Sequence, residues 1–191
     1  KYIEISNKDF KQLIISADDA ARVIDPVHNM YQYPASFSPL FAKTIINIFS
    51  KEGDYILDPF MGGGTSIIEA IKNGRNIIGN DINSLSYFLA KTKSQKLSKN
   101  DRSALKKWFE TIIDSTNISD IKKVNKINLP KHMSRPSVKK YMQWIEFYIK
   151  KTKKLKTEKQ RNFCLLVLLR VSKRVLDAHK VPLGIQKFRN L

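Results

Sequence analysis

The sequence predicts an α/β protein built on a Rossmann-like, doubly wound parallel sheet with a basic helical extension. Two short apolar runs, residues 55–58 and 76–80, enclose a Gly-rich turn and a helical segment, and this succession is typical of the start of a parallel sheet. After Lys93 the strand patterns fade and basic residues accumulate. We therefore expect an α/β part over residues 1–93 and a mainly helical part over 94–191. Only two strands are evident, so the sheet is predicted to be incomplete in this chain.

The segment before the first predicted strand indicates mainly helices. Residues 2–6 alternate as a short strand would, and residues 9–23 have a helical pattern that ends at a break near Pro26. Ser38 followed by Pro39 predicts a helix N-terminus, because serine caps helices and proline is favoured at the first helical position. The apolar residues expected on one face of that helix are Phe41, Ile45, Ile48 and Phe49.

The turn and helix between the two strands are marked by glycine. Residues 59–64 contain proline and three consecutive glycines, which excludes regular structure. Residues 65–73 are predicted to form a helix that Gly74 closes in the left-handed conformation. The next strand is expected to end at Asp81.

The basic half is predicted to be helical. Residues 101–114 and 138–149 have helical patterns, and residues 122–136, with two prolines, indicate a connecting loop. Thr157 and Gln160 have the spacing of a capping box, which predicts a last helix running to about residue 178. Aromatic residues at core-like spacing favour packing over base stacking: Trp108, Tyr141, Trp144, Phe147 and Tyr148.

Charge is divided unevenly along the chain. Of a net charge of +18, residues 1–90 hold 8 basic and 10 acidic residues, and residues 91–191 hold 27 and 7. Such a cationic half favours a polyanionic partner, and DNA is the leading candidate. The alternative is a solvated surface in a lysine-rich protein. The lysines predicted to contact nucleic acid are Lys151, Lys153, Lys154 and Lys156.

Cysteine, histidine and hydropathy exclude several classes of protein. The single cysteine, Cys164, rules out an internal disulfide and is predicted to be a small buried hydrophobe. We expect a reducing, cytoplasmic setting and no membrane span, since the longest aliphatic run is too short. His28, His132 and His179 are scattered, so no metal site is expected.

The Gly-rich turn is the strongest functional signal. Residues 58–65 read Asp-Pro-Phe-Met-Gly-Gly-Gly-Thr, and consecutive glycines let the backbone approach a ligand closely. Asp58 ends the first strand, where it is placed to bind a cationic amino group. Asp81 ends the second strand, where an acidic residue commonly binds ribose hydroxyls. A ligand with an adenosine end and an amino-acid end satisfies both carboxylates.

Two nucleotide-binding alternatives fit poorly. A P-loop requires lysine after the last glycine, and Gly64 is followed by Thr65 and Ser66. A dinucleotide site requires the spacing Gly-x-Gly-x-x-Gly, which the turn lacks.

The motif resembles the cofactor loop of S-adenosylmethionine-dependent DNA methyltransferases that modify the exocyclic amino group of adenine or cytosine. Residues 80–83, Asn-Asp-Ile-Asn, are similar to the ribose-binding motif of that family, and residues 32–39 to the element that closes over the methionine end. The resemblance implies S-adenosylmethionine as cofactor and DNA as partner. It implies these cofactor-binding residues: Tyr33, Pro34, Ser36, Phe37, Asp58, Pro59, Phe60, Met61, Gly62, Gly64, Thr65, Asp81, Ile82 and Asn83.

One element of that family is missing. Its catalytic motif contains a Pro-Pro-aromatic sequence that holds the flipped base, and this chain has no Pro-Pro pair. We therefore expect no catalytic residue here, with the motif supplied by a second polypeptide or by a missing C-terminal part. Two alternatives remain open: a non-catalytic nucleic-acid-binding subunit with the cofactor fold, and part of a tRNA guanine methyltransferase.

Overall fold

The chain divides into two compact units, residues 1–95 and 96–191, each with its own hydrophobic core. The computed structural model describes residues 4–18, 25–34, 36–115, 121 and 136–177.

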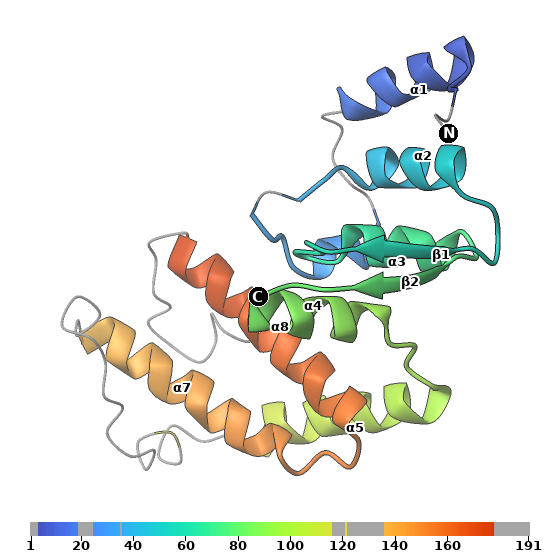
Figure 1. The fold of residues 1–191 in the computed structure, drawn as a ribbon. Helices are drawn as coiled ribbons and strands as arrows, with labels where there is room; N and C mark the ends of the chain where they lie inside the picture. Colours follow the sequence, from blue (N-terminus) through green and yellow to red (C-terminus); the bar gives the residue numbers. More distant parts are fainter. Residues whose placement is uncertain (1–3, 19–24, 35, 116–120, 122–135, 178–191) are drawn as a thin grey trace. The chain divides into compact units, whose positions relative to one another are not determined.

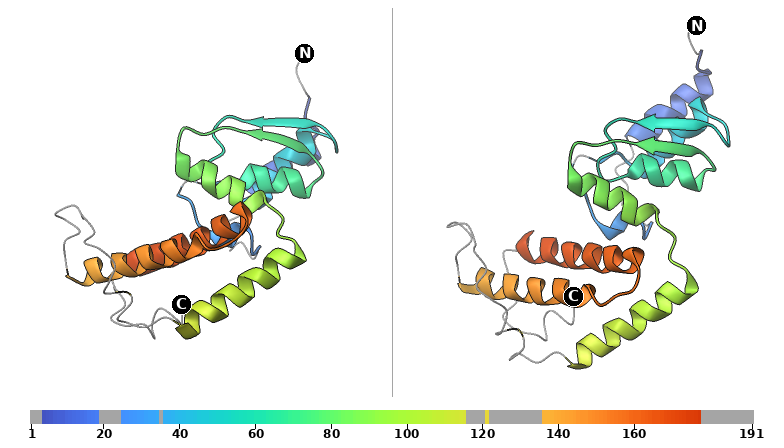
Figure 2. Two further views of the ribbon diagram at one scale, coloured as in Figure 1. Left: turned by 90° about the horizontal axis from the view of Figure 1, so that it is seen from below. Right: turned by 60° about the horizontal axis from the view of Figure 1, so that its bottom comes forward.

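The first unit is centred on two parallel strands, β1 (Tyr55–Asp58) and β2 (Asn76–Gly79), paired in register from their first to their last residues. Helices α3 (Thr65–Lys72) and α4 (Ser84–Ser94) lie on one side of these strands (Figure 2). The predicted first strand is confirmed, and the second ends two residues before Asp81. The mixed α/β class is therefore confirmed, with a sheet of two strands in the described part of the chain.

The two faces of this sheet differ in burial. On the inner face, Ile77 packs against a buried cluster of Met61, Ile67 and Ala90. On the outer face, Tyr55 is 78% exposed and Leu57 is 67% exposed. Apolar strand side chains are normally covered in parallel sheets.

Helices α1 (Asn7–Ala17) and α2 (Pro39–Phe49) precede the sheet, with the short 3-10 helix η1 (His28–Met30) between them (Figure 1). The strand expected at residues 2–6 is wrong over its described part, because Ser6 instead caps α1 by accepting a hydrogen bond from the Asp9 amide. Helix α1 ends at Ala17, and residues 19–23 of the predicted helix lie outside the described residues.

Helix α2 begins at Pro39, as the Ser-Pro signal predicts, and ends at Phe49. The predicted apolar face is only partly right, because Phe49 is exposed while Ala42, Thr44 and Ile46 are buried. The physical reason is that α2 packs against both α1 and α3. It therefore buries two sides, and Thr44 donates its hydroxyl hydrogen bond to the Leu40 carbonyl.

The second unit contains α5 (Lys99–Ser115), α7 (Pro136–Thr152) and α8 (Glu158–Asp177). The capping box that opens α8 is confirmed: the Gln160 amide donates to the Thr157 hydroxyl at 3.2 Å, and the Thr157 amide donates to the Gln160 side chain at 3.4 Å. All of the predicted loop except Pro136, which begins α7, lies outside the described residues.

Aromatic packing in this unit is confirmed where the side chains are described. Tyr141, Trp144 and Phe147 are buried, and Trp108 packs against a cluster that includes Cys164. Burial raises the pKa of the Cys164 thiol to about 12, as expected of an inert buried side chain. No described helix is long and apolar enough to cross a membrane.

Candidate cofactor site

The Gly-rich loop joins β1 to α3 in a conformation that depends on glycine. Gly62 and Gly64 have φ values of 47° and 81°, in the left-handed region. The Gly64 amide donates to the Met61 carbonyl at 2.8 Å, and the Met61 amide donates to the Asn80 carbonyl at 3.0 Å. The loop is therefore fixed both internally and to the end of β2.

Tyr33 connects the loop to the segment after β2. A Cβ added at Gly63 lies 2.6 Å from the Tyr33 Cβ, so only glycine permits this approach. The Tyr33 hydroxyl accepts hydrogen bonds from the Ser86 hydroxyl at 3.0 Å and from the Asn83 side-chain amide at 3.3 Å. Tyr33 therefore links three parts of the site: its own segment, the Gly-rich loop and the residues that follow β2.

The two carboxylates predicted to bind the cofactor also organise the loop. Asp81 accepts the Asn83 and Gly62 amides, both at 2.8 Å, and these hydrogen bonds lower the pKa of its carboxyl. Asp58 accepts the Phe60 amide at 3.0 Å and the Ser66 hydroxyl. Each carboxylate oxygen has a second lone pair for a ligand.

A small open pocket lies where the loop begins α3. Its volume is about 30 Å³, which is small for a ligand site. Phe37 and Phe60 at the pocket and Ile82 beyond β2 are exposed apolar side chains. The described residues thus form one wall of a ligand site rather than a closed cavity. The pocket is lined by Ser36, Phe37, Asp58, Phe60, Met61, Gly62, Gly63, Thr65 and Ser66.

The structure therefore separates the predicted cofactor residues into groups. Tyr33, Asp81 and Asn83 hold the loop, and Gly64 packs against Ala90 of α4. Pro34 and Pro59 are exposed beside lining residues. The other predicted residues line the pocket, except Ile82. Sequence reasoning missed Ser66, whose signal was its position in the first turn of the helix, and Gly63, which lies in the middle of the glycine run.

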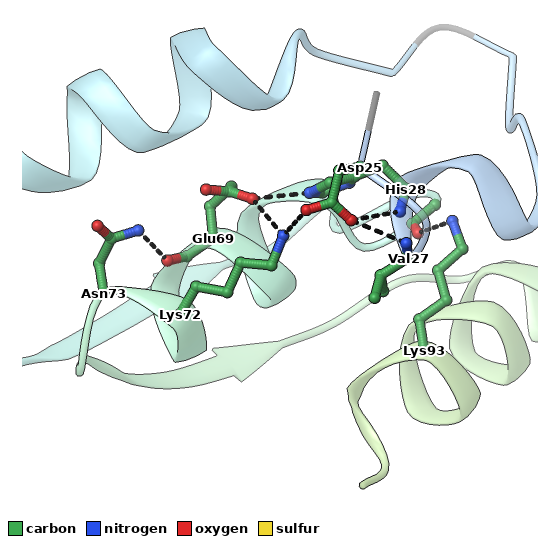
Figure 3. Close-up of polar contacts among 8 residues, drawn as sticks. Asp25, Val27, His28, Glu69, Lys72, Asn73 and Lys93 are labelled. Carbon is green, nitrogen blue, oxygen red and sulfur yellow. Dashed lines mark hydrogen bonds and ion pairs between the residues drawn. The ribbon is translucent and has the colours of Figure 1, made fainter. Parts of the chain in front are cut away.

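A partly buried polar cluster anchors the segment before Tyr33 to α3 (Figure 3). His28 Nε2 lies 2.7 Å from Glu69 Oε1, Lys72 Nζ lies 3.3 Å from the same oxygen, and Lys72 also pairs with Asp25. Burial by itself raises the pKa of Glu69, but the hydrogen bond from His28 and the charge of Lys72 outweigh it, so the pKa is lowered. Burial by itself lowers the pKa of Lys72, but its carboxylate partners Asp25 and Glu69 outweigh burial, so the pKa is raised.

This cluster bears on the expectation of no metal site. Ligand atoms of Asp25, His28 and Glu69 lie within 4.8 Å of one another, which the scattered spacing of histidine in the sequence did not predict. The Lys72 ammonium already contacts both carboxylates. The group is therefore best described as an ion-pair anchor. His132 and His179 lie outside the described residues.

The lysines predicted to contact nucleic acid surround the turn between α7 and α8. Lys153, Lys154 and Lys156 are exposed, while Leu155 is buried between them and fixes the turn. Lys151 lies with its Nζ 5.0 Å from the centre of the Phe147 ring. The turn therefore presents several lysine side chains to solvent, and the buried side chain of Leu155 anchors its backbone.

Comparison with known proteins identifies the first unit. Residues 8–91 match the family model described as DNA methylase. This segment is similar to the DNA methylase family. This similarity implies S-adenosylmethionine as the methyl donor, and the matched residues contain the Gly-rich loop, the 80–83 motif and most of α4.

Individual relatives share the same segment. The chain is 33% identical over 90 residues to the type II methyltransferase M.MjaII of Methanocaldococcus jannaschii, covering 47% of this chain and 16% of that protein. It is 39% identical over 70 residues to the type II methyltransferase M.MvaI of Kocuria varians, covering 35% and 15%.

A relative with a different substrate in its name also matches. The chain is 43% identical over 58 residues to a tRNA (guanine(10)-N2)-dimethyltransferase of Methanothermobacter thermautotrophicus, covering 30% of this chain and 17% of that protein. The matched segment thus spans about a sixth of the length of each of these relatives. No solved structure matches the chain.

Proposed function

We propose that this chain is the S-adenosylmethionine-binding portion of a DNA methyltransferase that modifies the exocyclic amino group of adenine or cytosine. The observation that carries the proposal is the joint placement of Asp58 and Asp81 at the ends of adjacent parallel strands, with a glycine loop between them. Ligands of doubly wound sheets bind at the carboxyl ends of the strands. Asp58 receives the methionine amino group, and Asp81 receives the ribose hydroxyls.

Catalysis requires a further structural part. The sequence lacks the Pro-Pro-aromatic motif, and the pocket has only one wall among the described residues. Two features of the sheet support the same conclusion. Its outer face exposes the apolar side chains of Tyr55, Leu57 and Ile78, and a two-stranded parallel sheet leaves unpaired edges. A second polypeptide, or further sequence of the same protein, supplies the catalytic motif and the remaining strands of a doubly wound sheet.

DNA is the proposed substrate, and the basic second unit is the proposed contact surface. The cationic turn that contains Lys151, Lys153, Lys154 and Lys156 supports this assignment. RNA remains the second candidate, because a tRNA methyltransferase is among the relatives that share the glycine loop. A binding subunit without catalysis is the third.

Calorimetry with two ligands tests the cofactor assignment. S-adenosylhomocysteine has both ends of the cofactor, whereas methylthioadenosine lacks the amino-acid end. We expect Asp58→Asn to weaken only the first ligand and Asp81→Asn to weaken both, by about tenfold to a hundredfold for a lost charge-assisted hydrogen bond. Asp54→Asn is the matched control, since Asp54 is exposed at the opposite end of β1. Unchanged affinities in both site variants contradict the proposal.

A further inference from the structure

Lys93 lies at a junction that the cofactor motifs do not include. It belongs to the last turn of α4, and its Nζ donates hydrogen bonds to the Tyr31 carbonyl at 3.0 Å and to the Gly63 carbonyl at 3.1 Å. One acceptor belongs to the segment that carries Tyr33, and the other belongs to the Gly-rich loop. A single ammonium group therefore joins three parts of the chain.

The environment of this ammonium is unusual for lysine. Burial lowers the pKa of Lys93 to about 8. No carboxylate of the described residues forms an ion pair with it. The groups that hold it are neutral carbonyls, aided by its place at the C-terminal end of α4, where the helix dipole favours a cation. Lys93 is half-buried, and an ammonium group withdrawn from water without a carboxylate partner costs free energy unless it is hydrogen-bonded. The two carbonyl acceptors are therefore what holds it in place.

The position of Lys93 indicates its role. Tyr33 Cβ packs against Gly63, so the segment and the loop are in direct contact at the place where Lys93 holds a carbonyl of each. Ser36 and Phe37 follow on the segment and line the pocket together with residues of the loop. Lys93 does not line the pocket itself. It acts on the Gly-rich loop and on the segment that carries Tyr33 through their backbone carbonyls.

We propose that Lys93 is a positioning residue that sets the spacing between the Gly-rich loop and the residues Tyr31, Tyr33, Ser36 and Phe37 before α2, and so shapes the half of the site that receives the amino-acid end of the cofactor. This inference rests on the proposed S-adenosylmethionine site. The adenosine end lies toward Asp81 and Ile82, to which Lys93 donates no hydrogen bond. Loss of the ammonium therefore affects the two ends of the cofactor unequally.

Lys93→Met tests the inference, because methionine keeps the length of the side chain and removes its donors. We expect S-adenosylhomocysteine affinity to fall about tenfold, as for loss of a hydrogen bond to a charged group, and methylthioadenosine affinity to fall markedly less. Lys43→Met, an exposed change on α2, is the matched control and should alter neither. An equal loss for both ligands in Lys93→Met overturns the inference, since it indicates a general structural effect.

Hydrogen exchange of the ligand-free chain supplies an independent measurement. In Lys93→Met, the amides of residues 62–64 and 31–33 should exchange faster together, while the strand amides of β1 and β2 keep their protection. Unchanged exchange in both segments overturns the role of Lys93. If the unmodified chain binds neither ligand, the proposed function fails, and the exchange measurement still decides whether Lys93 joins the two segments.

Discussion

Replacing Gly64 by alanine measures how tightly the cofactor loop packs against α4. At this position φ is 81°, and an added Cβ lies 2.9 Å from the Ala90 Cβ and 3.0 Å from its Cα. The left-handed conformation costs a non-glycine residue roughly 1–2 kcal/mol, and overpacking adds roughly 1–3 kcal/mol. Because Ala90 Cα belongs to a helix backbone, the neighbour cannot rotate away. We expect Gly64→Ala to destabilise the first unit by about 2–5 kcal/mol.

Gly53→Ala is the matched control for this change. Its φ is 87°, and no atom lies within 4 Å of an added Cβ, so it carries the conformational penalty alone. The difference between the two variants, about 1–3 kcal/mol, isolates the contact with Ala90. The free energy of opening is measured from native-state hydrogen exchange of the β1 and β2 amides. Equal destabilisation by the two variants would refute the packing argument.

Other predictions address the anchor, the buried lysine, the basic turn and catalysis. Glu69→Gln should destabilise the first unit by about 1–3 kcal/mol at neutral pH. Because the pKa of Glu69 is lowered in the folded state, this difference in stability should vanish as the pH falls through that pKa. The exposed substitution Glu4→Gln should leave the stability unchanged. The pKa of Lys93 falls from 10.5 to about 8 on folding, so the native state binds fewer protons and stability should rise with pH between these values; urea titrations of Lys93→Met should lack this rise. The isolated chain should transfer no labelled methyl group to duplex DNA, and clear incorporation would contradict the need for a further catalytic part. DNA affinity should fall steeply with salt, with about 0.9 in the log-log slope for each neutralised phosphate, and the slope should flatten, with cofactor affinity unchanged, when four lysines become glutamine: Lys151, Lys153, Lys154 and Lys156.

The elements with local signals could be predicted from the sequence. Strand β1 and the start of α2 follow from an apolar run between turn residues and from a Ser-Pro cap, and the capping box of α8 follows from the spacing of Thr157 and Gln160. Helix α4 was missed, although Asn83 caps it by accepting the Leu85 amide. Its apolar and basic residues alternate too closely for a clear periodic face.

Contacts between distant segments could not be predicted. Glu69 meets His28 across 41 residues of sequence, and Lys93 meets Tyr31 across 62. In a lysine-rich chain nothing local distinguishes Lys93 from a solvated lysine, because its burial depends on how α4 packs beside the loop. The motif residues that support the loop, such as Tyr33, likewise become distinguishable from lining residues only in three dimensions.

The order in which the first unit assembles follows from the packing of β1, α3, β2 and α4. Helix α3 contacts β1, β2 and α4, and β2 pairs with β1 after a short crossover through α3. Contacts between segments close in sequence form with less loss of loop entropy than contacts between distant segments. A growing polypeptide can therefore complete the glycine loop and its supports soon after α4 leaves the ribosome, before the helices of the basic unit have been synthesised.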